Sequence, residues 1–575
     1  MQQSNLNNTQ ATMNYNRPVI YFLLLWTVLN VLQAGTLEIH ADEAYYWMYS
    51  RFLDWGYYDH PPMVALFIKA GYSLIHNEFG LRLFTVLSSS VSLYLIWLML
   101  KKYQVNAKAF ILVIPGIFVF HIYGFTTTPD APLLLFTTLF FFFYQRYAER
   151  DSWPLALILA LVVAGLLYSK YHGILVVGFT LLSNLKLLKR PSFWGIVVLA
   201  VAFYTPHILW QINHDYPSIK YHLSERSAET YDFSYSYLYP LGQLVMAGPL
   251  IGWFLFYKSF TVRIKDTFMR TLLVNSIGIL IFFFLTSFKG EVQLHWTLIV
   301  YVPLAMLVLI HFAQSGWPAW FSRLAIVNIV LIVTLRLLIV WGPSFMMEVG
   351  AIRSFFGFKN WAKTVHDKAG DNYVIFSEGF QNPSKYNFYN NTVKGLNYDT
   401  RYYRRTQYDI WPIDDSIQRK KAYLVMEDRI PGVTPDTIKT PVGNWYAGWV
   451  NNVRTYQKID FKPLSYKVTA SPGQKLTFDL SFKNTYSFPI NFGNTPDESP
   501  VYFEACFFEN SSDLVNTQKA DDSFYHIALQ PGQTTQYKFT LTAPAKKGRY
   551  DLLFSLRTEP FAGGRNSGII NFTVK

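Results

Sequence analysis

Residues 38–63, EIHADEAYYWMYSRFLDWGYYDHPPM, combine carboxylates and histidines with many aromatic rings. The carboxylates include Asp42, Glu43 and Asp59, and the imidazole of His60 follows the last of these. A carboxylate within hydrogen-bond reach of an acceptor hydroxyl can take its proton as the oxygen attacks a sugar carbon. Tyr and Trp rings beside carboxylates suit the binding of a sugar ring or a lipid headgroup. We therefore expect this stretch to form the first wall of an active site.

The same residues also fit simpler structural roles. Asp42 suits the N-cap position of a helix that starts AYYWMYSRFL. Asp59 and His60 precede two prolines, a pattern typical of a turn that leads into the first turn of a helix. Glu43, Asp59 and His60 are also residue types that bind a divalent cation. The sequence leaves these roles open, and one residue can have two of them.

Charges this dense are costly in lipid, so the surrounding segments decide where they lie. The chain has 575 residues, of which 51% are hydrophobic and only 15% are charged, well below the quarter that is usual in soluble proteins. The apolar residues gather between Pro18 and about Val340, and residues 346–575 read as a soluble protein. A single cysteine, Cys506, excludes an intramolecular disulfide framework and a Cys-based zinc site. We expect a polytopic α-helical membrane protein with a soluble C-terminal part.

Hydropathy predicts 11 membrane spans and leaves a total of up to 13 open. They are 18–36, 82–100, 106–123, 130–147, 154–169, 173–188, 192–210, 237–257, 268–287, 294–312 and 319–341. Residues 61–76 carry Lys69 and two prolines and are expected to form an interfacial helix. Residues 1–17 are polar and predicted to be a disordered cytoplasmic tail, followed by an uncleaved signal anchor.

The loops sort by chemistry onto two faces. With the N-terminus in the cytoplasm, Lys and Arg collect in the inside loops. The loops with Asp, Glu and His, including the first external loop at 37–80, then share the opposite face. The net charge of +13 is therefore a topology signal and does not indicate a nucleic-acid partner. The C-terminal part is expected outside the cytoplasm.

Two folded regions are predicted after the transmembrane domain at 18–345. Residues 346–457 mix helix signals with short apolar strands and are read as a small α/β domain. From 458 to 575 apolar residues alternate, as at Leu476, Phe478, Leu480 and Phe482, with Gly-containing turns between the strands. This spacing favours an Ig-like β-sandwich.

Five motifs in the apolar half together resemble the GT-C glycosyltransferases. More narrowly, they are similar to the superfamily of protein O-mannosyltransferases and lipid A aminoarabinose transferases. The motifs are DEAYYWMYSRFLDWGYYDHPPMVALFIKAG, FGLRLFTVLSS at Arg82, TTTPDAPLLLF at Asp130, GLLYSKYHGILVV at Lys170 and SFKGEVQLHWTLIVYVPL at Lys289. They occur in the family's order across residues 18–340, and the C-terminal domains lie outside the resemblance.

The resemblance implies roles for individual residues. Asp42 would activate or orient the acceptor hydroxyl, with Glu43 and Asp59 as further catalytic candidates. Arg82, Lys170 and Lys289 would bind the donor phosphate and stabilise it as it leaves. Further substrate-binding candidates are Arg51, Tyr58, His60, His172, Arg226, His295 and Trp296. In the last motif Phe288 intervenes and Glu291 stands where the family commonly has a lysine.

For three of these motif residues a structural role is an alternative to the functional one. Lys170 could be a lysine whose ammonium reaches the interface from the end of a span. Arg82 could be an interfacial anchor. Asp130 fits an N-cap of the fourth span better than a catalytic role.

The predicted function is an inverting glycosyltransferase of the cytoplasmic (inner) membrane. It would move one sugar from a polyprenyl-phosphate donor to a lipid A, another glycolipid or a protein on the outer face. A divalent cation is the only cofactor considered, and the predicted partners are donor, acceptor and membrane lipids. The alternative is a flippase for lipid-linked sugars with an external binding domain. Transporters usually carry ionisable groups in broken helices near the bilayer midplane, often in related halves, and here the charges lie at one surface with no internal repeat.

Overall fold

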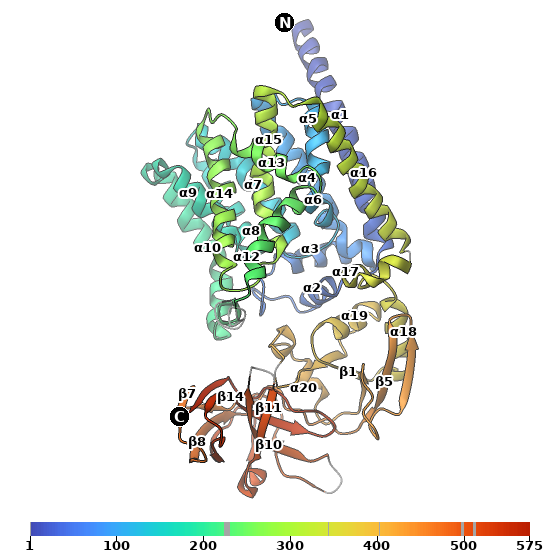
Figure 1. Cartoon of the computed structure of the whole chain (residues 1–575), viewed down its shortest axis with the longest axis vertical. Helices are drawn as coiled ribbons and strands as arrows, with labels where there is room; N and C mark the ends of the chain where they lie inside the picture. The colour runs from blue at the N-terminus through green and yellow to red at the C-terminus, as the bar shows by residue number, and fades with distance from the viewer. Residues whose placement is uncertain (1, 223–230, 343, 402, 496–498, 510–512) are drawn as a thin grey trace. The chain divides into compact units, whose positions relative to one another are not determined.

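The computed structural model describes residues 2–222, 231–342, 344–401, 403–495, 499–509 and 513–575, with side chains from Asn16 onward except those of residues 344 and 351. The chain divides into two compact units, Met1–Phe356 and Gly357–Lys575. The first unit is a bundle of apolar helices and the second is rich in β-strands (Figure 1). The predicted fold class is confirmed by this architecture.

Six described helices are long and apolar enough to span a membrane. They include α1 (Gln2–Thr36), α4 (Glu78–Leu100), α10 (Pro191–Asn213), α14 (Thr267–Thr286), α15 (Leu298–Ser315) and α16 (Ala319–Trp341). Helices α12 (Phe233–Ala247) and α13 (Gly252–Phe260) would form a seventh span, bent by 94° at the break between them. No Gly or Pro interrupts the segment before Pro18, and α1 extends back through most of the polar residues expected to form a tail.

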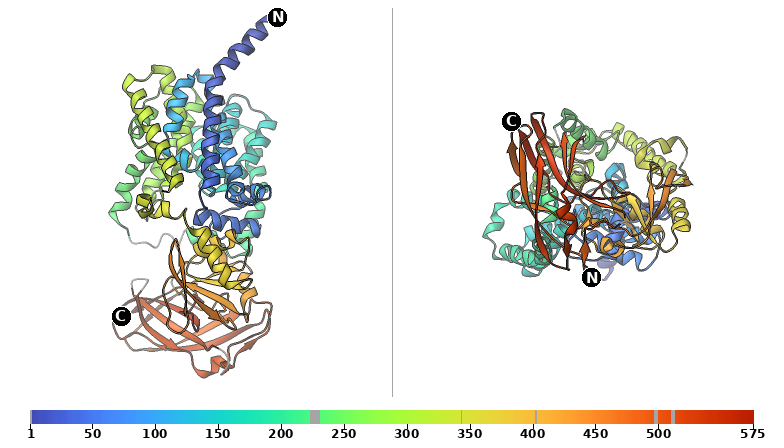
Figure 2. Two further views of the ribbon diagram at one scale, coloured as in Figure 1. Left: turned by 90° about the vertical axis from the view of Figure 1, so that its right-hand side faces the viewer. Right: turned by 90° about the horizontal axis from the view of Figure 1, so that it is seen from below.

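The other predicted spans correspond to shorter or interrupted helices. Span 106–123 divides into α5 (Ala107–Val113), η2 (Ile114–Gly116) and α6 (Phe118–Ile122), because Pro115 cannot continue the backbone ladder. The next three predicted spans contain α7 (Asp130–Glu149), α8 (Trp153–Ser169) and α9 (Gly173–Ser183) followed by η3 (Leu185–Lys189). Figure 2 shows these helices in two further views.

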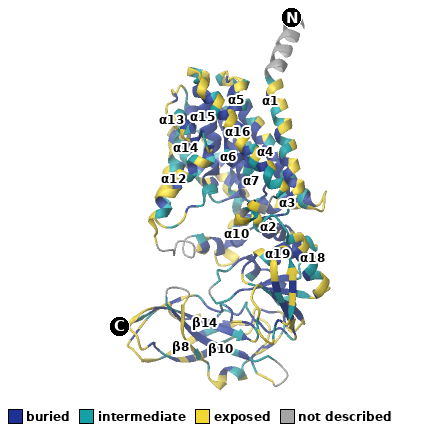
Figure 3. Ribbon diagram, turned by 45° about the vertical axis from the view of Figure 1, so that its right-hand side comes forward, coloured by how far each residue is buried: buried dark blue, intermediate teal, exposed yellow. Residues whose placement is uncertain are grey.

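Burial separates the inner helices of the bundle from the outer ones (Figure 3). The most apolar window of α15 is 89% buried, whereas those of α10 and α16 are each only 22% buried. Exposed apolar faces on α1, α10 and α16 include Leu25, Val198 and Val330. Such surfaces are expected where helices meet lipid, because no internal partner covers them. The first unit is therefore a multi-span membrane domain.

Short helices cluster between these long ones. After α1 come α2 (Ala41–Arg51) and α3 (Met63–Tyr72), and η1 (Lys101–Tyr103) follows α4. The segment after α10 holds α11 (Pro217–Lys220), and η5 (Leu294–Thr297) leads into α15. The unit ends with η6 (Ser344–Glu348) and α17 (Gly350–Arg353). Helix α3 occupies the stretch expected to be interfacial, and at 10 residues it is too short to span a bilayer.

The second unit opens with a mixed five-stranded sheet in the order β2-β1-β3-β5-β4. Its strands are β1 (Tyr373–Ser377), β2 (Gly395–Tyr398), β3 (Ala422–Met426), β4 (Asp436–Thr440) and β5 (Gly443–Val450). Strand β1 runs parallel to β2 and β3, and β5 is antiparallel to β3 and β4. The accompanying helices are α18 (Phe358–Ala369), α19 (Gln381–Tyr389), η7 (Gln407–Asp409) and α20 (Ile413–Ile417). Trp361 of α18 packs in the core of this region with Phe376 and Trp445.

The remaining strands form a β-sandwich. One sheet has the order β11-β10-β14-β15-β7, and the second has β13-β8-β6, with a separate β12-β9 pair. The strands are β6 (Lys462–Pro463), β7 (Lys467–Ala470), β8 (Lys475–Lys483), β9 (Ile490–Asn491), β10 (Val501–Glu509), β11 (Asp513–Lys519), β12 (Ala528–Leu529), β13 (Thr534–Thr542), β14 (Gly548–Thr558) and β15 (Ile570–Val574), with η8 (Asp522–His526) between β11 and β12. Residues Phe478, Leu480 and Phe482 of the predicted alternation lie in its core.

Candidate active site

Helix α2 begins the site, and its first turn is fixed by a capping box. His40 is the N-cap: its Nδ1 accepts a hydrogen bond from the Asp42 amide at 3.3 Å. In return the Glu43 carboxylate accepts one from the His40 amide at 2.9 Å. This reciprocal arrangement satisfies amides that a helix start leaves without intrahelical partners. The N-cap role considered for Asp42 therefore belongs to His40, and Asp42 lies in the first turn.

Glu43 and Arg82 form a buried ion pair between α2 and α4. Arg82 donates through Nε to Glu43 Oε1 at 2.8 Å and through Nη2 to Oε2 at 2.6 Å. Its other donors reach the carbonyl oxygens of Ala34, Leu37 and Glu38 at 3.1, 2.7 and 2.9 Å. These are five bonds, which equal the number of N–H donors of a guanidinium. In this arrangement Arg82 holds the end of α1 against α2 and has no further N–H for a phosphate.

The Glu43 carboxylate is likewise enclosed. It is fully buried, and besides Arg82 and the His40 amide it accepts a bond from the Thr127 amide at 2.8 Å. Burial would raise the pKa of Glu43, but the Arg82 charge and these hydrogen bonds outweigh it and hold the pKa below its ordinary value. Glu43 therefore joins three segments, α2, α4 and the loop before α7. Its geometry supports a positioning role and leaves the predicted catalytic role untested.

Asp42 has the opposite environment to its neighbour. Its side chain is 44% exposed, and its Oδ2 lies 3.6 Å from His40 Nδ1. A negatively charged side chain in the first turn of a helix interacts favourably with the helix dipole. Of the acidic pair, Asp42 is thus the residue with the accessible carboxylate.

Asp59 is surrounded by tyrosine side chains. Its Oδ1 accepts a short hydrogen bond from Tyr49 and a longer one, at 3.5 Å, from Tyr45. Tyr49 is stacked on Tyr57 with ring centroids 3.8 Å apart. The Asp59 backbone carbonyl accepts a hydrogen bond from His222 Nε2 at 3.1 Å. Asp59 is buried, so these contacts fix the shape of the loop around it.

Asp130 and Lys170 form the second buried ion pair of the unit. Lys170 Nζ lies 2.9 and 3.0 Å from the two carboxylate oxygens, and the side chains are only 5% and 3% exposed. Lys170 is the extended C-cap residue between α8 and α9. The pair excludes the alternative in which Lys170 reaches toward the interface. Asp130 does not act as an N-cap, because Pro129 holds that position without a side-chain bond. His295 Nε2 lies 3.9 Å from Asp130.

Tyr46 lies near all of these acidic groups except Glu43. Burial raises the pKa of Tyr46 well above its ordinary value, and three carboxylates raise it further. These carboxylates belong to Asp42, Asp59 and Asp130. Tyr46 therefore lies near charged residues of both the first external loop and the start of α7. The sequence favoured an N-cap role for Asp130, and the structure instead pairs this residue with Lys170. The pairing depends on the packing of α7 against α8, which a sequence motif does not show.

Beside this cluster lies a cavity of about 1070 Å³. One wall is apolar and comes from α9 and α14, with Ile174, Leu175, Phe282, Phe283 and Leu285. The polar lining includes His60, Lys170, Tyr171, His172, Ser218, His222, Lys289, Glu291 and Trp296. A pocket that has both apolar and cationic lining residues fits an amphipathic ligand such as a lipid phosphate.

Some of the predicted substrate-binding residues line this cavity, and others lie away from it. His172, Lys289 and Trp296 line it, and His172 packs 5.4 Å from the Trp296 ring. Arg51 stacks on Trp47 at 5.4 Å, and the buried Tyr58 packs on Tyr221 at 5.6 Å. The position of Arg226 lies outside the described residues.

Helix α10 and the start of α11 pack against the first external loop. Trp210 Nε1 donates to Asp54 Oδ2 at 2.8 Å, and His207 Nδ1 donates to the Trp55 carbonyl at 2.8 Å. Ser218 Oγ donates to the Tyr57 carbonyl at 2.8 Å. Gly56 is required here, since an added Cβ would lie 2.4 Å from the Trp210 ring. Hydropathy assigned most of α10 to a membrane span, so these contacts could not be predicted from the sequence.

The predicted cation ligands do not gather. Within the described ranges, no group of three or more His, Cys, Asp and Glu residues could hold a metal ion. Glu43 is engaged by Arg82, and Asp59 by Tyr49. His60 lines the cavity instead. No mechanistic step is assigned to a metal.

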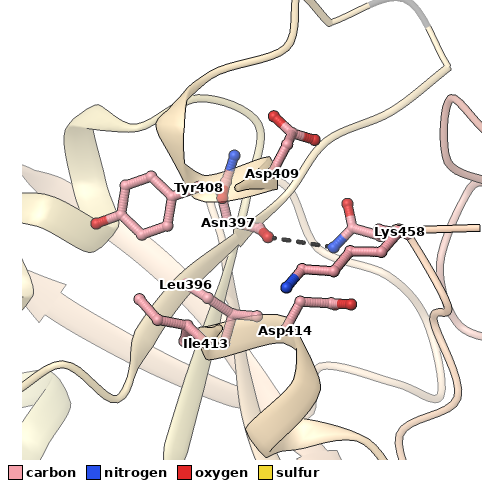
Figure 4. Close-up of a pocket in the computed structure, with 8 residues that line it drawn as sticks. Leu396, Asn397, Tyr408, Asp409, Ile413, Asp414 and Lys458 are labelled. Carbon is pink, nitrogen blue, oxygen red and sulfur yellow. Dashed lines mark hydrogen bonds between the residues drawn. The ribbon is translucent and has the colours of Figure 1, made fainter. Parts of the chain in front are cut away.

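The second unit holds a much smaller cavity, of about 10 Å³, between β2, η7 and α20. Asp409, Asp414 and Lys458 approach it, as the close-up in Figure 4 shows. Tyr486 donates to Asp414 Oδ2 at 2.5 Å. A space of this size holds about one water molecule. It is too small for a sugar, so we place the active site in the helical unit.

Comparisons with known proteins agree with this location. Residues 59–210 match the family described as dolichyl-phosphate-mannose-protein mannosyltransferase. Lipid A galacturonosyltransferase RgtD of Rhizobium johnstonii is 26% identical over 215 residues, which are 35% of this chain and 44% of that relative, so the match spans less than half of the relative's length.

Two solved structures share the fold. ArnT from Cupriavidus metallidurans aligns with a TM-score of 0.56 in its apo state, at 14% identity, over 76% of this chain and 98% of ArnT. The same protein bound to undecaprenyl phosphate aligns with a TM-score of 0.54, also at 14% identity, over 76% of this chain and 99% of ArnT.

Proposed function

We propose that the chain is a GT-C membrane glycosyltransferase that transfers one sugar from a polyprenyl-phosphate donor to an acceptor hydroxyl. The observation that carries this proposal is the cavity whose lining combines apolar residues of α9 and α14 with Lys170 and Lys289. The apolar wall suits a polyprenyl chain, and the lysines suit its phosphate. The undecaprenyl phosphate bound to ArnT and the lipid A named for the galacturonosyltransferase support a lipid-linked donor and a glycolipid acceptor. A protein acceptor is the second choice.

The proposed reaction is a direct displacement at the anomeric carbon. The acceptor oxygen forms the new bond to this carbon as the bond from the carbon to the phosphate oxygen breaks. The electron pair leaves with the phosphate, and the acceptor proton passes to Asp42, the accessible carboxylate of the acidic pair. Lys289 and the Asp130–Lys170 pair provide the electrostatic environment of the leaving phosphate. One displacement without a covalent intermediate inverts the anomeric configuration.

The proposed location follows from the positive-inside pattern of the loops. The carboxylate cluster and the second unit would lie outside the cytoplasmic membrane, in the same compartment as the acceptor. Labelling single introduced cysteines with an impermeant reagent, in a Cys506→Ala background, tests this orientation. Reactivity at residue 55 from the cytoplasmic side only would contradict it.

Label transfer in proteoliposomes tests the function. Purified wild type, Asp42→Asn and the distal control Glu149→Gln receive radiolabelled polyprenyl-phosphate sugars and candidate acceptors. We expect wild type and Glu149→Gln to transfer label and Asp42→Asn to lose at least about 100-fold, the typical contribution of a positioned base. Donor that crosses the bilayer without being consumed would instead support the flippase alternative. Full activity of a correctly inserted Asp42→Asn protein would remove Asp42 from the mechanism.

A further inference from the structure

Two opposite charges lie at the rim of the cavity without neutralising each other. Lys289 and Glu291 both line it from the turn between α14 and η5, and both side chains are exposed. Among the described residues neither has an ion-pair partner within 4.0 Å, although the two are separated by one glycine. Glu291 Oε2 accepts one hydrogen bond, from Gln293 Nε2 at 3.1 Å. The rim therefore offers a cation and a carboxylate to a ligand separately.

The lysine of this pair differs from the other lysine of the cavity. Lys170 is held by Asp130, so most of its charge is compensated within the protein. Within the described part of the chain Lys289 has no such carboxylate, and it is the stronger candidate for direct contact with the donor phosphate. The Glu291 carboxylate would repel an anion, so it is not suited to bind the phosphate. A different part of the ligand, such as the sugar, is the group that Glu291 could contact.

An aromatic surface for that second part lies close by in the chain. Trp296 of η5 lines the cavity, and its ring is packed by His172 at 5.4 Å and Phe283 at 6.0 Å. His172 and Phe283 also contact each other, with ring centroids 5.1 Å apart, so the three rings form one cluster that holds the indole from one side. A fixed aromatic face is suited to the C–H face of a sugar ring, and a carboxylate beside it accepts the ring's hydroxyl or amino protons.

We propose that Glu291 is a specificity-determining residue that selects the sugar by charge. The preferred donor would carry a neutral or amino sugar on its polyprenyl phosphate, and a sugar with a carboxylate of its own would be disfavoured. Repulsion between exposed like charges is modest, so the discrimination contributed by Glu291 is about 5- to 10-fold. This proposal rests on the proposed function, and it would distinguish the chain from the galacturonosyltransferase that it matches in part.

Competition between labelled donors tests the proposal. Full-length protein in proteoliposomes receives two undecaprenyl-phosphate donors, one with a neutral hexose and one with the corresponding uronic acid. We expect wild type to favour the hexose, and we expect Glu291→Gln to reduce this preference about 5- to 10-fold, mainly through KM. Glu291→Lys should reverse it, and Glu291→Asp should restore it. The distal Glu149→Gln protein should keep the wild-type ratio.

Two results would overturn the inference. One is a wild type that uses the uronic donor as well as the neutral one, and the other is an unchanged ratio in Glu291→Gln. Native mass spectrometry of the same proteins measures donor binding without turnover. If no protein transfers label but wild type still binds the hexose donor selectively and Glu291→Gln does not, the transferase proposal fails and the charge selection stands. If binding shows no selection, the inference fails even in an active enzyme.

Discussion

Replacing Glu43 by Gln tests whether the buried pair of the first loop holds the fold or performs chemistry. The substitution leaves Arg82 fully buried and charged, with two fewer charge-assisted bonds. Removing one partner of a buried pair costs about 3–5 kcal/mol, because the remaining charge has lost its compensation. At 2–4 °C per kcal/mol, a scale taken from soluble domains, the melting temperature should fall by roughly 6–20 °C.

Thermal unfolding in detergent, followed by tryptophan fluorescence or by size-exclusion of a fluorescent fusion, measures this change. The double variant Glu43→Gln/Arg82→Met removes both charges and should recover part of the loss, giving a coupling free energy in the double-mutant cycle. Glu149→Gln is the matched control, because its pair with Lys102 is 53% and 44% exposed and is worth at most about 1 kcal/mol. A Glu43→Gln protein that melts like wild type yet transfers no sugar would refute the positioning role and favour a catalytic one.

Two further predictions concern the other buried charges. Lys170→Met should leave Asp130 buried without its cation and reduce both stability and transfer. Lys170→Arg should restore part of the stability, and a Lys170→Met protein as stable as wild type would contradict the ion pair. In the second unit, burial and then the Asp409 charge raise the pKa of Asp399 to about 8, against opposing hydrogen bonds from the Gly379 amide and Asn397. The folded state thus binds more protons than the unfolded state between about pH 4 and 8, so the free energy of unfolding should fall as pH rises through this window, by up to about 1.4 kcal/mol per unit. The measurement is hydrogen-exchange protection of β1 and β2 against pH, corrected for intrinsic exchange rates. Asp399→Asn should make protection fall less steeply with pH, and the exposed control Asp367→Asn should keep the wild-type slope. Equal slopes in the two variants would exclude Asp399 as the source.

The sequence was most informative where one physical signal dominated. Apolar length located the membrane helices, because lipid permits few other structures at that depth. Strict alternation in residues such as Phe478 and Leu480 located the sandwich core, because side chains of a strand alternate between faces. The bend between α12 and α13 and the break at Pro115 were not predicted, because hydropathy does not register the direction of a helix.

The site was harder to predict, because the type of a charged residue does not determine which residue it pairs with. Asp42 and Glu43 are adjacent acids, yet one is half exposed and the other is fully buried. Arg82 and Lys170 are both cations in matching motifs, and both turned out to have carboxylate partners some 39 and 40 residues away. Only tertiary packing decides such pairings. Motif resemblance pointed to segments that lie close together in the structure, and it could not separate residues that position others from residues expected to contact substrate.

The order of the two buried pairs along the chain has a consequence for membrane insertion. In each pair the acid precedes the base, Glu43 before Arg82 and Asp130 before Lys170. The five acceptor atoms described for Arg82 belong to residues 34–43, which leave the ribosome before the arginine does. Because these acceptors are synthesised first, Arg82 can pair with them as it enters the membrane. An unpaired arginine in lipid would be costly. We expect the swapped protein, Glu43→Arg/Arg82→Glu, to insert less well than wild type even though the same two charges remain.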